Sequence, residues 1–152
     1  GYRVPRRLIG RGTPFGLIPA RLAPVFRDRH ELAAGDLREN VEAALCSSRF
    51  LVVLCSPAAA RSKWVDQEVR LFKQCRPDGE VLAAIIAGEP WAADMPGREA
   101  EECFPPALKE DYDGEGQPTG ERAEPLAADL RAGRDGRNLG LLKLIAGMFA
   151  MG

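Results

Sequence analysis

Two unbroken apolar runs constrain the fold of this chain more than any other feature. They are "FLVVLC" at residues 50–55 and "VLAAIIA" at residues 81–87. Strands of a parallel sheet that are covered by helices on both faces have continuous apolar sequences of this kind. A helical pattern follows the first run, and strand and helix candidates alternate along the rest of the chain; this alternation predicts an α/β fold with a central parallel sheet. We therefore expect the two runs to form adjacent, buried, parallel strands.

The remaining elements are marked by turn and capping residues. Asp36, with Glu39 three residues later, has the spacing of a capping box and predicts a helix start. Ser56-Pro57 predicts the start of the helix after the first apolar run. The other expected segments are a Pro- and Gly-rich loop at 3–24, a short strand at 24–28, a loop at 30–36, a long irregular excursion at 88–122, a short strand at 125–130 and a closing helix at 138–150.

One residue of the helix after Ser56 is out of place. At about 100° per residue, Trp64, Val69 and Phe72 fall in one apolar sector of the helix. Glu68 lies inside that sector, between Trp64 and Phe72. A carboxylate that faces a core is costly, so its presence there indicates a use other than packing.

Composition excludes several classes of function. A chain of 152 residues predicts one domain, and a net charge of −1 does not favour nucleic acid as a partner, although residues 1–27 carry arginines and no acid. His30 is the only histidine and has no partner in a nucleophile motif, so we expect neither a zinc site nor a hydrolase triad. No apolar run approaches the roughly 18 residues that span a bilayer.

The cysteines are Cys46, Cys55, Cys75 and Cys103. They have no metal-site spacing and predict reduced core residues of a cytoplasmic protein.

The segment from residue 24 to residue 90 resembles a bacterial Toll/interleukin-1 receptor (TIR) domain. The resemblance rests on "FRDRHELAAGD" and "ENVEAALCSSRFLVVLCSPAAARSKWVDQE". These contain an aromatic-x-Asp strand end, a Leu-x-x-Gly loop, a buried strand that ends in Ser, and Ser62-x-Trp64-x-x-x-Glu68. The resemblance implies a flavodoxin-like fold with helices on both faces of the sheet.

The beginning of the chain departs from that family pattern. TIR domains usually open with a strand and a helix that "GYRVPRRL" does not match. We therefore expect a single TIR domain over residues 1–152 that lacks the first strand and helix, with a basic loop segment at 1–23 and the sheet-and-helix core at 24–152.

The resemblance implies an enzyme that cleaves NAD+ into nicotinamide and ADP-ribose or a cyclic ADP-ribose. It also implies an effector role in a bacterial antiphage protein, self-assembly with other TIR domains, and a sensor domain outside this chain. NAD+ would be the substrate, and neither a cofactor nor a metal is expected. Glu68 would be the catalytic residue, and Trp64, Phe26, Asp28, Arg29, Ser56 and Ser62 would bind the substrate.

A single carboxylate is chemically sufficient for this reaction. The nicotinamide of NAD+ is a cationic pyridinium that leaves as a neutral molecule, so no general acid is needed, unlike ordinary glycoside hydrolysis. A carboxylate near the ribose stabilises the oxocarbenium-like transition state. Trp64 lies one turn before Glu68 on the same helix face, and its indole suits a cationic ring. We expect a pocket between Trp64, the Phe26–Asp28 strand end and Ser56.

Each of these residues also has a structural interpretation. Glu68 fits an ion pair with Arg29 or Arg49, and Trp64 fits the core. Asp28 fits a backbone N–H partner, while Ser56 and Ser62 fit helix caps. Arg29 fits either a phosphate of NAD+ or solvent. We expect the loop from Arg29 to Asp36 to be exposed and to gate the pocket.

Two other functions stay open from the sequence. The first is a TIR scaffold that assembles through its loops and carries no chemistry, although such members often lack the glutamate. The second is another doubly wound module such as a receiver domain, in which "SKWVDQE" would have no role.

Overall fold

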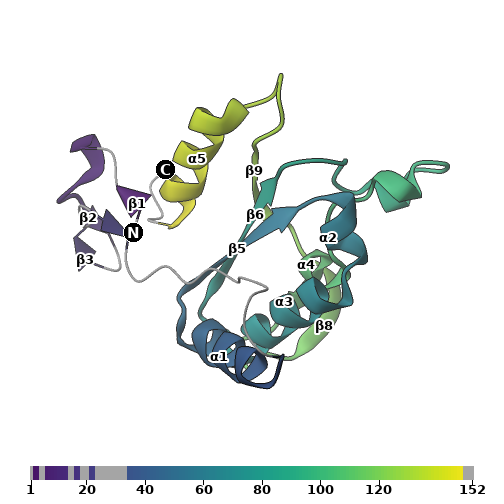
Figure 1. Cartoon of the computed structure of the whole chain (residues 1–152), viewed down its shortest axis with the longest axis horizontal. Helices are drawn as coiled ribbons and strands as arrows, with labels where there is room; N and C mark the ends of the chain where they lie inside the picture. Colours follow the sequence, from purple (N-terminus) through teal and green to yellow (C-terminus); the bar gives the residue numbers. More distant parts are fainter. Residues whose placement is uncertain (1, 4–5, 14–15, 18–20, 23–33, 149–152) are drawn as a thin grey trace.

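A parallel sheet with helices on both faces forms the centre of the molecule (Figure 1). The computed structural model describes residues 2–3, 6–13, 16–17, 21–22 and 34–148. The sheet has the strand order β5–β6–β9, formed by β5 (Phe50–Cys55), β6 (Glu80–Ile85) and β9 (Leu126–Asp129). All pairs are parallel. The predicted α/β class and the adjacency of the two apolar runs are therefore confirmed.

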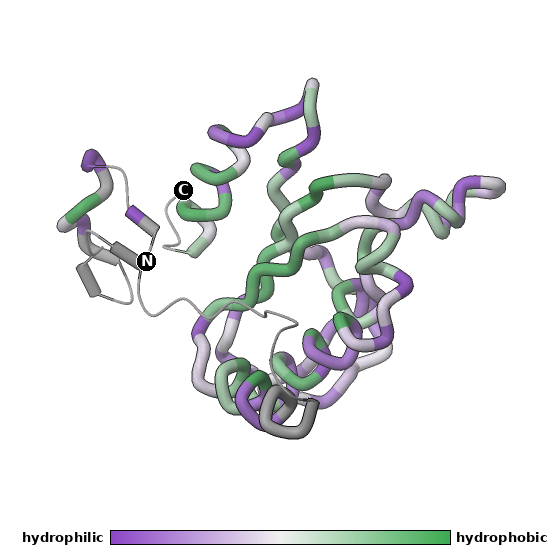
Figure 2. Tube along the Cα trace, in the orientation of Figure 1, coloured by the Kyte–Doolittle hydropathy of each residue, from purple (hydrophilic) through white to green (hydrophobic). Residues whose placement is uncertain are grey.

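The two faces of the sheet bury different helices. Val53, Ala83 and Ile85 pack with Val69 of α3 (Lys63–Cys75) and with Leu108 of α4 (Pro106–Lys109). On the opposite face, Leu82, Ala84 and Ala128 pack with Leu144 of α5 (Gly136–Met148). Figure 2 shows the corresponding band of hydrophobic residues along the strands. Continuous apolar sequence in β6 thus reflects burial on both faces.

The prediction that the first run is buried on both faces is wrong for β5. Val52 and Leu54 are 37% and 59% exposed on the side of the sheet that carries α5. The reason is that α5 packs over β6 and β9. The second run is also shorter than predicted, because β6 ends at Ile85 and Ile86 is 47% exposed.

Helix boundaries correct two further predictions. Helix α1 spans Ala34–Ser47, so Asp36 lies in the first turn and is not the cap. The segment after β5 forms two helices, α2 (Pro57–Arg61) and α3, that meet at Ser62. In the expected gating loop, residues 34–36 are helical, while residues 29–33 and the expected strand at 24–28 lie outside the described residues.

The excursion between β6 and β9 is more ordered than predicted. It contains the short helices η2 (Ala92–Asp94), η3 (Glu99–Glu101) and α4, and an antiparallel hairpin of β7 (Glu110–Tyr112) and β8 (Pro118–Arg122). The Asp113 carboxylate accepts hydrogen bonds from the Glu115 and Gln117 N–H groups at 2.9 Å and shapes the hairpin turn. The hairpin was not predicted because every residue of β8 is exposed and no apolar alternation marks the strand.

Short elements also interrupt the loop expected at residues 3–24. They are β1 (Tyr2–Arg3) paired with β4 (Arg21–Leu22), β2 (Gly12–Thr13) paired with β3 (Gly16–Leu17), and η1 (Arg6–Leu8). No helix in the described part of the chain is long and apolar enough to cross a membrane.

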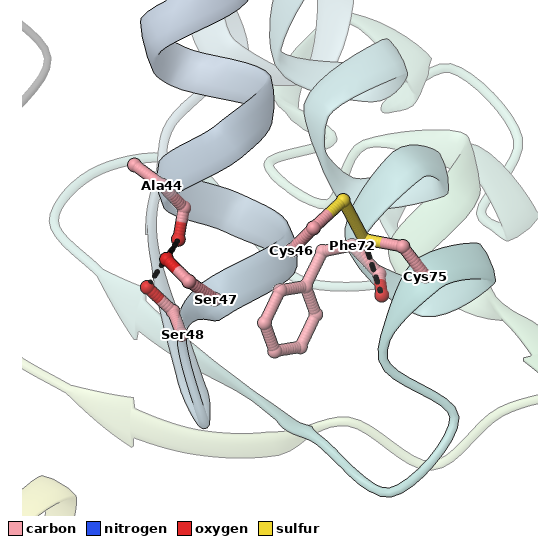
Figure 3. Close-up of a disulfide and its surroundings, with 6 residues drawn as sticks. All are labelled: Ala44, Cys46, Ser47, Ser48, Phe72 and Cys75. Carbon is pink, nitrogen blue, oxygen red and sulfur yellow. Dashed lines mark hydrogen bonds between the residues drawn. A yellow bond between two sulfur atoms is a disulfide. The ribbon is translucent and has the colours of Figure 1, made fainter.

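The prediction that all four cysteines are reduced is wrong for two of them. Cys46, near the end of α1, and Cys75, the last residue of α3, form a disulfide with a Cα–Cα distance of 5.4 Å (Figure 3). The two cysteines are 29 residues apart, and only the packing of α1 against α3 brings them together. Spacing along the sequence therefore gave no signal for this pair.

Cys55 and Cys103 are free and fully buried, as predicted. Burial raises the pKa of the Cys55 thiol to about 12 and that of Cys103 to about 11, and each is raised further by nearby acidic groups. Since the reactive form of a cysteine is the thiolate, neither should react in the folded protein.

Alkylation with iodoacetamide at about pH 8, followed by mass spectrometry, tests this assignment. We expect no labelled cysteine in the native protein, labelling of Cys46 and Cys75 after reduction, and labelling of Cys55 and Cys103 only after unfolding. Fast labelling of Cys55 or Cys103 in the native state would contradict the burial of these two thiols.

Candidate active site

Two serines set the direction of the helices that follow β5. Ser56 accepts a hydrogen bond from the Ala59 N–H at 3.1 Å and caps α2. Ser62 accepts one from the Val65 N–H at 3.3 Å and caps α3. The capping interpretation of both serines is thus confirmed. The break at Ser62 fixes where α3 starts and hence which of its residues face α1.

The pocket that contains Glu68 lies between α1 and α3. It has a volume of about 150 Å³. The lining residues are Val41, Glu42 and Leu45 from α1, and Trp64, Gln67, Glu68 and Leu71 from α3. The structure therefore brings Trp64 and Glu68 together in one pocket, as their spacing of one helical turn predicted.

Burial differs from the floor of this pocket to its rim. Val41 and Leu45 are 3% and 8% exposed and form an apolar floor. Trp64 and Glu68 are half-buried, and the Oε1 atom of Glu68 is fully buried. Glu42 and Gln67 are exposed and lie at the rim. A carboxylate beside apolar groups acts in a low dielectric, where its effect on a nearby cation is strong.

The described part of the pocket lining is electronegative. It includes two carboxylates, Glu42 and Glu68, and an indole ring, and no lysine or arginine is among the lining residues that the structure describes. Carboxylates and the face of an indole both attract positive charge. The lining therefore suits a cationic ring next to a centre that becomes positive during reaction.

The far side of α3 is anchored to the following segment of the chain. The Asp66 carboxylate accepts a hydrogen bond from the Ala107 N–H at 2.7 Å and one from Arg70 at 2.8 Å. The Lys73 ammonium donates to the carbonyls of Ala107 and Glu110 at 2.7 and 2.6 Å, and burial lowers its pKa. These bonds fix the rotation of α3, so they hold Trp64 and Glu68 toward α1.

Two of the other predicted site residues are not part of the described pocket lining. Ser56 and Ser62 are absent from its lining and act as helix caps. Phe26, Asp28 and Arg29 lie outside the described residues. The sequence did not predict Glu42 as a site residue, because only the packing of α1 on α3 places it in the same pocket as Glu68.

The carboxyl ends of β6 and β9 are joined by an ion network that sequence reasoning also missed. Arg131 contacts Asp129 at 2.6 Å, Glu89 at 2.8 Å and the carbonyl oxygen of Gly88. The hydrogen bond from Arg131 lowers the pKa of the Asp129 carboxyl. The hydrogen bonds to Asp129 and Glu89 raise the pKa of the Arg131 guanidinium. Arg131 thus pairs with both carboxylates, and these ion pairs link the segment after β6 to the end of β9.

Glu102 is a buried carboxylate with a structural role, in contrast to the role proposed for Glu68. It is 8% exposed and accepts hydrogen bonds from the N–H groups of Trp91, Ala93 and Phe104 at 2.9–3.3 Å, and it pairs with Lys109. Burial opposes ionisation of Glu102, but these donors outweigh it and lower its pKa. Glu102 thereby organises the excursion between β6 and β9.

Comparison with known proteins identifies the family. The family model for the TIR domain matches residues 18–104. The chain is also 34% identical over 144 residues to the NAD(+) hydrolase ApTIR of Actinoplanes sp., an alignment that covers 86% of this chain and 19% of that relative. The chain thus spans about a fifth of the relative's length. No solved structure gives a significant match. With more than half of its residues matched by the family model and the α/β fold described above, the chain belongs to the TIR domain family.

Proposed function

We propose that this chain cleaves the bond between nicotinamide and ribose in NAD+, in the pocket that contains Trp64 and Glu68. The observation that carries the proposal is the pairing of the Trp64 indole with the Glu68 carboxylate beside an apolar floor. The 34% identity to a protein named NAD(+) hydrolase supports the same chemistry.

The proposed roles follow from where charge develops. The pyridinium ring lies against Trp64, and the ribose lies beside Glu68. As the C1′–N bond breaks, the electron pair leaves with nicotinamide, and positive charge moves onto the ribose, where the Glu68 carboxylate stabilises it. Water then adds to C1′ and loses a proton, giving ADP-ribose; addition of an internal nucleophile of the substrate gives a cyclic product instead.

The remaining predicted residues complete the proposal. Phe26, Asp28 and Arg29 contact the rest of the dinucleotide, and Ser56 and Ser62 hold α2 and α3 in place as caps. Glu42 adds negative charge at the rim. The domain works in the cytoplasm as the effector of a bacterial antiphage protein, and it assembles with other TIR domains under the control of a separate sensor domain.

Release of nicotinamide from NAD+, followed by chromatography with ADP-ribose and cyclic ADP-ribose standards, tests the activity. We expect nicotinamide and one ADP-ribose product in equal amounts. We also expect no release from NADH, because dihydronicotinamide is not a cationic leaving group. Equal cleavage of NADH would contradict the role assigned to pyridinium charge.

A further inference from the structure

The disulfide between Cys46 and Cys75 links the two helices that form the walls of the Glu68 pocket. Cys46 directly follows Leu45, which lines the α1 side of the pocket. Cys75 lies one helical turn beyond Leu71, which lines the α3 side. Figure 3 shows the bridge between the ends of the two helices. The bridge therefore restrains the distance between the two walls at one end of the pocket.

Apolar contacts join the two helices in addition to the bridge. Val41 and Leu45 of α1 form a buried cluster with Phe72 of α3, which is 0% exposed. Leu51 and Val81 of the sheet pack against the same cluster. We therefore expect these contacts to hold α1 on α3 when the bridge is open, so that breaking the bridge loosens the pocket while the helices stay packed.

The two bridged cysteines are also more exposed than the two free ones. Cys46 and Cys75 are half-buried, while Cys55 and Cys103 are 0% exposed. Thiol–disulfide exchange requires access of a thiolate to one of the bridge sulfurs. Reduction therefore acts at the pocket walls and leaves the core thiols unchanged.

We propose that the Cys46–Cys75 disulfide is a reversible redox clamp on the Glu68 pocket, with the oxidised form binding NAD+ more tightly. This inference rests on the proposed function of that pocket. A dithiol reductant opens the clamp: its thiolate breaks the S–S bond and forms a mixed disulfide, and the released cysteine thiolate takes up a proton. The second thiol of the reductant then displaces the other cysteine, so the protein gains two electrons and two protons and the reductant becomes a disulfide.

The test measures kcat and KM for NAD+ in the oxidised protein, after treatment with dithiothreitol and after reoxidation. We expect reduction to raise KM by about fivefold or more, a coupling of the usual size, with kcat within about twofold. Reoxidation should restore KM. The Cys46→Ser/Cys75→Ser double variant should have the high KM and no response to dithiothreitol. Cys55→Ala, which keeps the bridge, should respond as the parent does.

Two results would overturn the clamp: an unchanged KM when mass spectrometry confirms full reduction, or free Cys46 and Cys75 thiols in the unreduced protein. The parent chain responds to dithiothreitol even if the double variant fails to fold, so the test does not depend on that variant. If no form cleaves NAD+, the proposed function fails. The clamp is then tested by acrylamide quenching of the Trp64 fluorescence in a Trp91→Phe variant, in which Trp64 is the only tryptophan. Stronger quenching after reduction supports the clamp, and equal quenching overturns it.

Discussion

Replacing Glu68 with glutamine should lower the rate of nicotinamide release by about two to three decades, because one preorganised electrostatic group contributes about 3 to 4 kcal/mol to the transition state. Glutamine keeps the shape of the side chain and some of its hydrogen bonding, but it cannot stabilise a developing cation. The melting temperature should change by less than about 3 °C, since Glu68 lines a pocket and a shift of that size corresponds to about 1 kcal/mol in a domain of this length.

The rate of nicotinamide release and the melting temperature should be measured together for the parent and each variant. Glu115→Gln, which removes an exposed carboxylate in the hairpin turn, is the matched control and should leave both unchanged. On the scaffold interpretation, Glu68 serves the structure, and its replacement lowers the melting temperature while no activity exists to lose. A folded Glu68→Gln protein that cleaves NAD+ at the parent rate would exclude our assignment of Glu68.

Replacing Leu82 with alanine should lower the free energy of unfolding by about 3 kcal/mol, within the range of about 2–5 kcal/mol for a buried leucine. Leu82 is 1% exposed in the central strand β6 and packs under α5. The loss combines the transfer of the removed carbon atoms with the cavity that remains.

Leu126 provides a matched control for this prediction. It is the register partner of Leu82 on β9, but it is 53% exposed. Leu126→Ala should therefore cost about 1 kcal/mol or less. Urea denaturation of the two variants measures both values, and equal losses would contradict the placement of β6 at the centre of the sheet.

The sequence predicted the elements whose burial leaves a continuous apolar signal. The runs at β5 and β6 and the closing helix α5 were identified because each packs against the core. Ser56 and Ser62 were identified as caps because a serine at a helix start has a local partner. The pairing of Trp64 with Glu68 followed from their spacing on one helix.

What the sequence did not predict depends on contacts between distant segments. Glu42 enters the pocket, and Cys46 meets Cys75, only because α1 packs on α3. The exposure of Leu54 depends on which strands α5 covers. Strand β8 is exposed at every position, so no hydrophobic periodicity marks it. Each of these features is a property of tertiary packing rather than of local sequence.

The most direct test of the account is an experimental structure of the Glu68→Gln protein with NAD+ bound, since slow turnover should preserve the substrate. We predict the nicotinamide ring against Trp64 and the adjoining ribose beside residue 68, between α1 and α3. NAD+ bound elsewhere, for example at the Arg131 network beyond β6 and β9, with the pocket of Trp64 and residue 68 empty, would contradict it.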